Sequence, residues 1–293
     1  MDSIRGGRVF VVGVTSQIGA SLGIALKSHG IQFAGSSRSL QQSDVCSIHL
    51  FDHKEQLLNP QADSVDAIIA LSPLSTIEFT LRIAELLGAR RLIAYGSTGV
   101  FSKSGSTNLL DREFVREQLD AEKLLAQRAT QLSILWTLFR PTMIYGAGTD
   151  QNVTFIRSMI RRFRAFPIPF GAKGRRQPVH VEDLADACVK VLNNPATFNR
   201  AYNLGGGEVI EYAEMVRRIC RADRLPARLI PIPSMLYRWI VRLARRMPGL
   251  AYLNEAMVDR MFTDLTTDHS EAARAFGYAP RKFQPPGRVV PEN

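Results

Sequence analysis

The segment from Val9 to Gly19 joins an apolar run, a glycine turn and the start of a helical pattern. Its sequence is Val-Phe-Val-Val-Gly-Val-Thr-Ser-Gln-Ile-Gly, and its β-branched residues favour a strand that ends at Gly13. Apolar residues then recur at helical spacing, at Ile18, Leu22, Ala25 and Leu26. Gly30 follows a Lys-Ser-His turn, which predicts the end of the helix. The segment therefore predicts a strand, a tight turn and a helix.

A strand that runs through a glycine turn into a helix is suited to binding a pyrophosphate. Free backbone N–H groups and the positive end of the helix dipole face the space above such a turn. Gly13 and Gly19 match the first and third glycines of the dinucleotide fingerprint, one for the turn and one for close packing of helix on strand. Ser16 stands at the middle position, where it takes up room but can donate a hydrogen bond to a phosphate. The expected cofactor-binding residues of this segment are Gly13, Thr15, Ser16, Gln17, Ile18 and Gly19.

Further apolar runs alternate with helical patterns along the first half of the chain. The expected strands after the first are 31–34, 47–51, 67–71, 91–95 and 134–139. A helical pattern over 76–87 is stopped by Gly88. Strands that are apolar throughout and alternate with helices predict an α/β fold, a Rossmann-type doubly wound parallel sheet with helices on both faces. We expect residues 1–146 to form an NAD(P)-binding core, and residues 147–293 to add the last core strands and a smaller, basic substrate lobe.

The charge is concentrated in the second half of the chain. Residues 1–146 carry 14 basic and 13 acidic side chains, whereas residues 147–293 carry 23 and 14. The stretches 151–181 and 224–254 contain no acidic residue and carry seven and six basic ones. Clustered arginine suits an anionic partner such as a diphosphate or an anionic membrane, although a solvated helix face explains it equally well. Nucleic acid is not expected, because no aromatic stacking platform or reading helix accompanies the charge.

Other features indicate an enzyme-sized cytoplasmic protein. The chain has 293 residues, of which 45% are hydrophobic, and this is enough for one large domain or a domain with a lobe. Cys46, Cys188 and Cys220 match no metal or disulfide spacing, so we expect reduced thiols and no metal. The first eight residues leave no room for a signal peptide before the first strand, and no uncharged apolar run reaches the ~20 residues needed to cross a bilayer.

Four segments in the later part of the chain carry a family resemblance. Three of them are Arg140-Pro-Thr-Met-Ile-Tyr-Gly, Gly174-Arg-Arg-Gln-Pro-Val-His-Val-Glu-Asp-Leu-Ala and Tyr202-Asn-Leu-Gly-Gly-Gly-Glu, and the fourth begins at Asp268 and reads Asp-His-Ser-Glu-Ala-Ala-Arg-Ala-Phe-Gly-Tyr-Ala-Pro. Together with the fingerprint they resemble the extended short-chain dehydrogenases/reductases, the NAD(P)-dependent epimerases and dehydratases of nucleotide sugars. The resemblance runs in order from Val9 to about Phe283 and is strongest to the epimerase-like proteins of polysaccharide loci.

The resemblance implies roles for particular residues. Ser97 stands where the family has a Ser or Thr that hydrogen-bonds the reacting substrate oxygen. Arg176 occupies the place of the arginine that binds the substrate diphosphate, which a bidentate guanidinium suits well. Pro141 and Thr142 stand where the family surrounds the nicotinamide end of the cofactor.

The catalytic pair of the family, Tyr-x-x-x-Lys, has no counterpart at the expected place. One register puts Phe114 and Gln118 in the two positions, and the other puts Leu119 in the Tyr position with Lys123 as the lysine. Neither register supplies a phenol, so another group must transfer the proton if the chain is an enzyme. Lys103, on the loop after Ser97, and Tyr145 are the candidates.

The end of the second strand predicts the cofactor. NAD-binding members usually carry an acidic residue there, which accepts a hydrogen bond from the ribose 2′-OH. This chain has none between Ala34 and Ser39, and Ser37 and Arg38 are available to a 2′-phosphate, so NADP is expected and NAD is less favoured. By position, Asp52 is expected beside the adenine, and Ser72 and Pro73 beside the phosphates.

Two functions remain open from the sequence. The first is an NAD(P)-dependent epimerase, dehydratase or reductase acting on a nucleotide-diphosphate sugar in surface polysaccharide synthesis. The second is a catalytically silent NADP-binding sensor or scaffold. A homodimer is compatible with either.

Two arginine-rich segments also carry apolar stripes. One contains Phe155, Met159, Ile160 and Phe163, and the other contains Leu236, Trp239, Ile240 and Leu243. Packing of both stripes against the sheet is the favoured interpretation, and peripheral contact with an anionic membrane is the alternative.

Overall fold

The computed structural model describes residues 7–37, 48–50, 64–148, 150, 152–224, 228–246 and 256–287. The chain divides into two compact units, and each is made of segments that are separate in the sequence. The first unit contains Met1–Pro141, Val181–Leu204 and Asp268–Ala279. The second contains Thr142–His180, Gly205–Thr267 and Pro280–Asn293.

Within the described residues, the first unit is built on a seven-stranded sheet in which every neighbouring pair is parallel. The strand order is β11-β6-β5-β4-β1-β2-β3. The strands are β1 (Arg8–Val12), β2 (Gln32–Ser37), β3 (Ile48–Leu50), β4 (Ala67–Ala70), β5 (Arg91–Tyr95), β6 (Leu135–Pro141) and β11 (Arg200–Leu204). Because β2 and β4 flank β1 on opposite sides, the order reverses at β1, as in doubly wound sheets. This confirms the predicted Rossmann-type fold.

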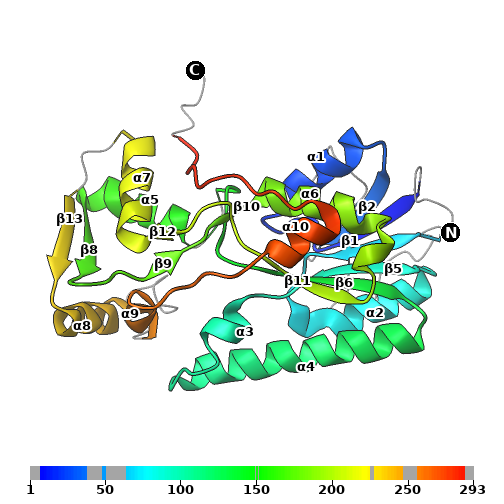
Figure 1. Cartoon of the computed structure of the whole chain (residues 1–293), viewed down its shortest axis with the longest axis horizontal. Coiled ribbons are helices and arrows are strands. Elements are labelled where there is room, and N and C mark those ends of the chain that lie inside the picture. The colour runs from blue at the N-terminus through cyan, green and yellow to red at the C-terminus, as the bar shows by residue number, and fades with distance from the viewer. Residues whose placement is uncertain are drawn as a thin grey trace. The chain divides into compact units, whose positions relative to one another are not determined.

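Helices cover both faces of this sheet (Figure 1). One face carries α1 (Gly19–Ser28), α6 (Val181–Leu192) and α10 (Ser270–Phe276). The other carries α2 (Ile77–Leu86), preceded by the short helix η1 (Leu74–Thr76), and the long α4 (Leu109–Gln131). The glycines Gly30 and Gly88 follow α1 and α2 with positive φ angles of 69° and 65°, which is the conformation that ends a helix.

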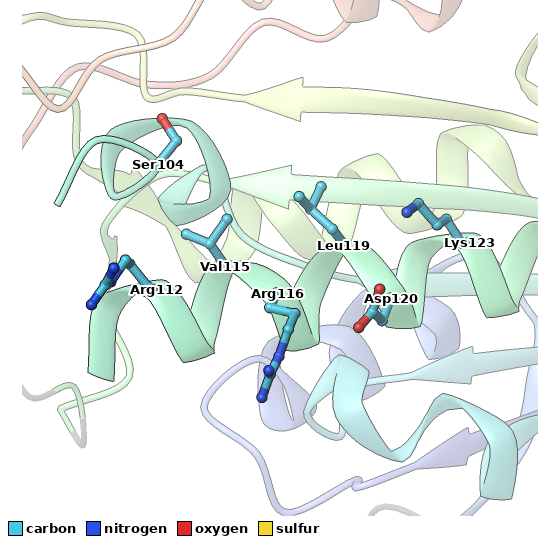
Figure 2. Close-up of a pocket in the computed structure, with 7 residues that line it drawn as sticks. All are labelled: Ser104, Arg112, Val115, Arg116, Leu119, Asp120 and Lys123. Carbon is cyan, nitrogen blue, oxygen red and sulfur yellow. The ribbon is translucent and has the colours of Figure 1, made fainter. Parts of the chain in front are cut away.

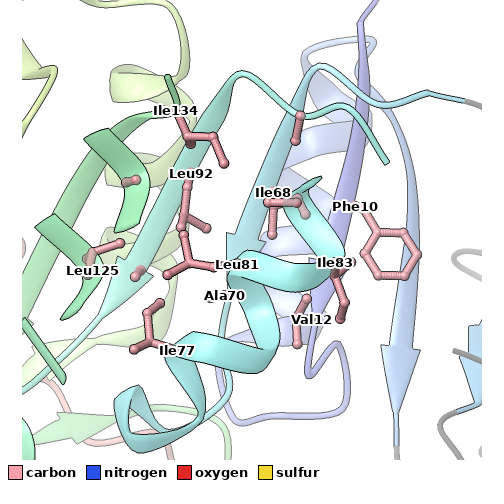
Figure 3. Packing of buried hydrophobic residues seen from close by; sticks show 14 of the residues in the cluster. Phe10, Val12, Ile68, Ala70, Ile77, Leu81, Ile83, Leu92, Leu125 and Ile134 are labelled. Carbon is pink, nitrogen blue, oxygen red and sulfur yellow. The ribbon is translucent and has the colours of Figure 1, made fainter. Parts of the chain in front are cut away.

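The core beneath α2 and α4 consists of aliphatic and aromatic side chains from the two helices and from the strands that they cover. Figure 3 shows these side chains meeting between the helices and the sheet. The buried members that it labels are Phe10, Val12, Ile68, Ala70, Ile77, Leu81, Ile83, Leu92, Leu125 and Ile134. Such burial is the main stabilising term for the fold, and it fixes the face of α4 that points toward the strand ends.

The second unit contains three two-stranded sheets and four helices within the described residues. The strand pairs are β7 (Ile144–Tyr145) with β10 (Val179–His180), β8 (Ala165–Pro169) with β13 (Arg228–Ile232), and β9 (Arg175–Arg176) with β12 (Ile210–Glu211). The helices are α5 (Val153–Phe163), α7 (Tyr212–Ala222), α8 (Ser234–Ala244) and α9 (Ala256–Arg260). Searched over the same residues, the chain has no helix with the length and apolarity to cross a bilayer.

The two apolar stripes differ from the expectation that both pack inward. On α5, Ile160 is buried, whereas Phe163 is 57% exposed. On α8 the whole expected stripe is exposed, and the buried side chains are Tyr237 and Val241 on the opposite face. The favoured interpretation was therefore wrong for α8: the helix is apolar on two faces, and tertiary contacts decide which one is covered.

Candidate functional site

The glycine turn after β1 has the geometry that the fingerprint predicts. Gly13 has φ +81°, and the backbone N–H groups of Gly13 and Val14 donate to Ser36 O at 3.0 and 3.1 Å. A Cβ added at Gly19 would lie only 1.7 Å from Val14 O, so the first turn of α1 can approach the turn this closely only with glycine there. The N-cap position of α1 is occupied by Ile18, which is buried, so no side chain at that position hydrogen-bonds the first N–H groups of the helix.

The hydroxyl of Ser16 is the distinctive group at this turn. Its Oγ is shielded from solvent and has no hydrogen-bond partner. An unsatisfied buried hydroxyl costs about 1–3 kcal/mol, and a ligand that reaches it recovers this cost. Beside it, Thr15 Oγ1 lies 2.9 Å from Ser37 Oγ, which ties the turn to the end of β2. An anionic group at the start of α1 fits these residues.

The loop after β4 lies against the same turn. Ser72 N would be 3.1 Å from a Cβ added at Gly13. Thr76 Oγ1 donates to Ser72 Oγ at 3.1 Å and to Pro73 O at 2.8 Å, which fixes the loop. The structure thus brings together the fingerprint residues with Ser37, Ser72 and Pro73. Two other predicted cofactor residues, Arg38 and Asp52, lie outside the described residues.

Ser97 lies at the carboxyl end of β5, beside the end of β6. Gly96 N donates to Phe139 O at 2.7 Å, and both the backbone N and the Oγ1 of Thr98 donate to Pro141 O at 3.1 Å. Ser97 Oγ accepts a hydrogen bond from Gly99 N at 3.0 Å. Since a serine hydroxyl both donates and accepts, this arrangement orients the oxygen and leaves its proton for another acceptor.

One face of α4 presents Phe114, Gln118 and Glu122 to these strand ends, four residues apart. A Cβ added at Gly99 would lie 2.9 Å from Phe114 Cε1 and 3.0 Å from Ser97 Oγ, so the ring and the hydroxyl flank the same glycine. A Cβ added at Gly96 would lie 3.6 Å from Gln118 Oε1 and 3.5 Å from Glu122 Oε1. The structure therefore places Phe114 and Gln118, the two residues of the first register, beside Gly99 and Gly96 at the end of β5.

Gln118 and Glu122 differ in how their oxygens are satisfied. Glu122 accepts two hydrogen bonds from Arg140, Nε to Oε1 at 2.8 Å and Nη2 to Oε2 at 2.6 Å. Gln118 is only 9% exposed, and its Oε1 is buried with no partner. Sequence reasoning did not assign Gln118, Glu122 or Arg140 to the site. For Gln118 and Glu122 the available signal was the spacing of four residues from Phe114 to Gln118 and from Gln118 to Glu122, because it puts the three side chains on one face of α4.

Lys103 extends toward the same aromatic ring. Its Nζ lies 4.0 Å from the centroid of the Phe114 ring and 3.4 Å from Asp111 Oδ1. Asp111 is buried, and its Oδ2 accepts a hydrogen bond from Ser106 Oγ at 2.9 Å. The lysine thus contacts both a carboxylate and a ring face, and about a quarter of its side chain remains exposed.

The second candidate for proton transfer, Tyr145, is enclosed in the core of the second unit. Its side chain is completely buried and packs edge to face against His180 and Phe283. Its hydroxyl accepts a hydrogen bond from Gln284 N at 3.2 Å. A phenol held in this way has a structural role, and its catalytic assignment stays a prediction that a Tyr145→Phe variant tests.

Arg176 is also in the second unit, and it is buried rather than presented to solvent. Its Nη1 donates to Arg175 O and Thr263 O at 2.8 and 3.1 Å, and its Nη2 donates to Arg260 O at 2.7 Å. The guanidinium stacks 5.1 Å from the centroid of Tyr212, and burial lowers the pKa of Arg176 to about 10. These bonds join β9 to the segment after α9. The expected contact with a diphosphate stays a prediction.

Gln177 connects two of the sequence motifs within the second unit, a role that the sequence reading did not assign. Its Nε2 donates to Gly206 O at 3.0 Å, and its Oε1 accepts from Thr267 N at 2.9 Å. Its backbone oxygen accepts a hydrogen bond from Thr142 Oγ1. A Cβ at Gly205 would lie 2.4 Å from the Gln177 amide, so close packing around this side chain requires glycine at position 205.

A shallow pocket of about 350 Å³ lies on another face of α4. Figure 2 shows six of its lining residues along the helix, with Ser104 from the segment after α3 (Gly99–Ser102) opposite them. The helix residues are Arg112, Val115, Arg116, Leu119, Asp120 and Lys123. Phe114, Gln118 and Glu122 do not line it, so this pocket is separate from the residues gathered at the strand ends.

Comparisons with known proteins identify the family of this chain. The family model described as "NAD dependent epimerase/dehydratase family" matches residues 9–205. A UDP-glucose 4-epimerase from Vibrio cholerae is 27% identical over 163 residues, which is 55% of this chain and 47% of that protein. The chain thus spans about half the length of this curated relative.

Solved structures show the same fold at low identity. An epimerase from Methanothermobacter thermautotrophicus has a TM-score of 0.69 at 16% identity, and the alignment covers 94% of this chain and 88% of the other. A UDP-glucose-4-epimerase from Stenotrophomonas maltophila, solved with bound NAD and formylated UDP-arabinopyranose, has a TM-score of 0.68 at 16% identity and 94% coverage of both chains. The family model matches well over half of the sequence, and the fold agrees with it: this chain belongs to the NAD-dependent epimerase/dehydratase family.

Proposed function

We propose that this protein binds NADP(H) and a nucleotide-diphosphate sugar, and that it exchanges a hydride at a ring carbinol of the sugar. Epimerisation, dehydration and keto-reduction all include such an exchange, and surface polysaccharide synthesis is the process that we propose for it. The observation that carries the proposal is the grouping of Ser97, Phe114 and Lys103 at the carboxyl end of β5. In open parallel α/β sheets, ligands bind at this edge.

The cofactor-binding residues of the proposal lie in the first unit. The turn from Gly13 to Gly19 would hold the pyrophosphate, with the unpartnered Ser16 hydroxyl donating to it. Solved relatives contain NAD, and the family is NAD-dependent by description. We nevertheless propose NADP, because residues 34–39 contain no acid and include Arg38. When bound, the nicotinamide supplies or accepts the hydride.

Lys103 is the proposed proton donor. Its ammonium lies over the ring of Phe114, which has no hydroxyl of its own to give a proton. A lysine ammonium carries a proton that it can deliver to a substrate oxygen oriented by Ser97, and the ion pair with Asp111 holds the ammonium in this place. This favours the direction in which a keto group is reduced, because the new alkoxide then takes its proton from the protein.

Gln118 is proposed to bind a hydroxyl of the ligand. Its buried Oε1 has no partner, and it points toward Gly96 at the end of β5. A neutral amide can accept a hydrogen bond from a ribose or sugar hydroxyl, but it cannot assist proton transfer by its charge as a lysine does. In this proposal, Gln118 contributes to ligand binding, and another residue supplies the acid–base group.

The decisive experiment measures binding and turnover on the purified chain. NADPH and NADH are titrated separately, and a panel of nucleotide sugars is then tested for a change in nicotinamide absorbance and for products by mass spectrometry. Lys103→Met should lower turnover by ~10²-fold or more with little effect on binding. Lys27→Met, an exposed lysine in the last turn of α1, is the matched control and should be unaffected.

Two results would change the assignment. The proton-transfer role would move to Tyr145 if Lys103→Met kept full activity while Tyr145→Phe lost turnover by ~10²-fold or more, with both variants folded. Tight NADPH binding by the wild type with no turnover on the whole panel would favour the sensor or scaffold function. Equal or tighter binding of NADH would refute the cofactor preference.

A further inference from the structure

The outward face of α8 is apolar, and its large side chains are exposed among the described residues of its unit. The exposed large side chains on this helix range from 41% to 80% exposed. They are Met235, Leu236, Trp239, Ile240 and Leu243. Monomeric soluble proteins rarely expose a contiguous group of this kind, and such groups usually mark an interaction site.

The helix geometry separates this face from the buried one. At about 100° per residue, the five exposed side chains occupy an arc of roughly 140°, and Tyr237 and Val241 lie on the opposite side. These two side chains pack with Ile168 and Val258 in a cluster of the second unit. The helix is therefore anchored by one face while the other is presented outward.

Phe170 is a further exposed apolar residue, and its backbone lies near the start of the helix. It directly follows β8, and its backbone N donates to Ile232 O at 2.8 Å, near the end of β13 and two residues before α8 begins. Its side chain is 76% exposed. In Figure 1, α8 lies at the end of β13. We call these six side chains the α8 face: Phe170, Met235, Leu236, Trp239, Ile240 and Leu243.

The charged residues of the segment that contains α8 are all basic. Residues 224–254 contain six arginines and no acidic residue. Arg242 is exposed and lies on the helix at one border of the apolar arc, and Arg245 and Arg246 follow directly after the helix. Arg238, at the same border, is paired with Asp259. An apolar stripe with Trp and Leu, bordered by arginines, is the pattern of a helix that lies in a membrane interface.

We propose that the α8 face binds the surface of an anionic membrane, with its apolar side chains inserted at the level of the headgroups and Arg242, Arg245 and Arg246 contacting the lipid phosphates. A second copy of this chain fits the surface less well. Two-fold pairing through the same patch would bring these arginines close to their own counterparts. Negative headgroups satisfy both the apolar and the basic part of the surface.

The test uses the full chain and vesicles of two compositions, phosphatidylcholine alone and phosphatidylcholine with phosphatidylglycerol. Co-sedimentation is measured at low and high salt. The chain has two tryptophans, so a Trp136→Phe background lets the fluorescence of Trp239 report its own environment. We expect binding to the anionic vesicles at low salt, weaker binding at high salt, and a blue shift of Trp239 on binding.

Substitutions on and off the patch separate specific from general effects. Trp239→Ala should weaken vesicle binding about tenfold or more, because a large apolar group leaves the interface. Arg242→Gln should weaken it about fivefold. Leu110→Ala and Arg112→Gln are the matched controls, because Leu110 and Arg112 belong to α4 of the first unit. The side chain of Leu110 is 62% exposed, close to the 64% of Trp239. The controls should bind as the wild type does.

Three results would overturn the proposal. One is the absence of binding to anionic vesicles at low salt. Another is equal loss of binding in the control variants, which would indicate attraction by net charge alone. The third is self-association without lipid, measured by sedimentation velocity and abolished by Trp239→Ala, which would assign the α8 face to a second copy.

Discussion

Replacing Gln118 by Met should make the unliganded protein more stable and a weaker binder. The Oε1 atom of Gln118 is buried without a hydrogen-bond partner, and such a group costs about 1–3 kcal/mol. Met has nearly the same length and helix propensity as Gln, so α4 itself should be unaffected. The expected gain in the free energy of unfolding is about 1–2 kcal/mol, which corresponds to a rise in Tm of roughly 2–6 °C for a protein of this size.

The assay compares thermal and urea unfolding of wild type and variant by circular dichroism, with and without NADPH and a nucleotide sugar. Gln127→Met, an exposed position on the same helix, is the control and should change stability by less than about 0.5 kcal/mol. The ligand-induced rise in Tm should be smaller in Gln118→Met, because the proposed hydrogen bond to the ligand is lost. A Gln118→Met variant that is less stable than wild type by 1 kcal/mol or more would show that the amide oxygen is already satisfied, and the reasoning would fail.

Two further predictions concern the scaffold. Gly19→Ala should destabilise the first unit by about 3 kcal/mol or more, because the new Cβ would lie 1.7 Å from a backbone oxygen. Urea unfolding measures this loss. Gly105→Ala is the control and should be neutral, because no heavy atom lies within 4 Å of its added Cβ. The hydrogen bonds from Arg218 lower the pKa of Glu208, so this pair stabilises the protein above pH 4.5 and the contribution is lost as the pH falls through the lowered value. The Tm difference between wild type and Glu208→Gln should shrink between pH 7 and pH 3, and a constant difference would contradict the pKa shift.

Local patterns in the sequence were sufficient for the fold of the first unit. The run from Val9 to Gly19, the stop glycines and the alternation of apolar strands with helices predicted the parallel sheet, because strand and helix periods and glycine turns depend on neighbouring residues. The glycine turn after β1 was found for the same reason, whereas Ser97 at the end of β5 came from the family resemblance. In each case the feature lies within about ten residues of chain.

The composition of the site required the tertiary structure. That Gln118 is buried with a free oxygen, and that Lys103 lies over Phe114, follows from the packing of α4 on the strand ends. The family resemblance gave Arg176 as a site residue, and Tyr145 was a candidate phenol; only the structure shows that both have polar groups engaged by backbone atoms inside the second unit. The sequence shows the chemical type of a residue, whereas the hydrogen-bond partners of its side chain come from segments far away along the chain.

The sequence by itself determined which segments become strands, turns and helices, and it determined the family to which the chain belongs. Only the tertiary structure decided which of two apolar faces each helix buries. On α8 both faces are apolar, and periodicity favoured the one with Trp239, whereas the structure buries Tyr237 and Val241. The physical reason is that burial depends on the partner surface: the cluster around Ile168 and Val258 receives one face, and the other remains exposed.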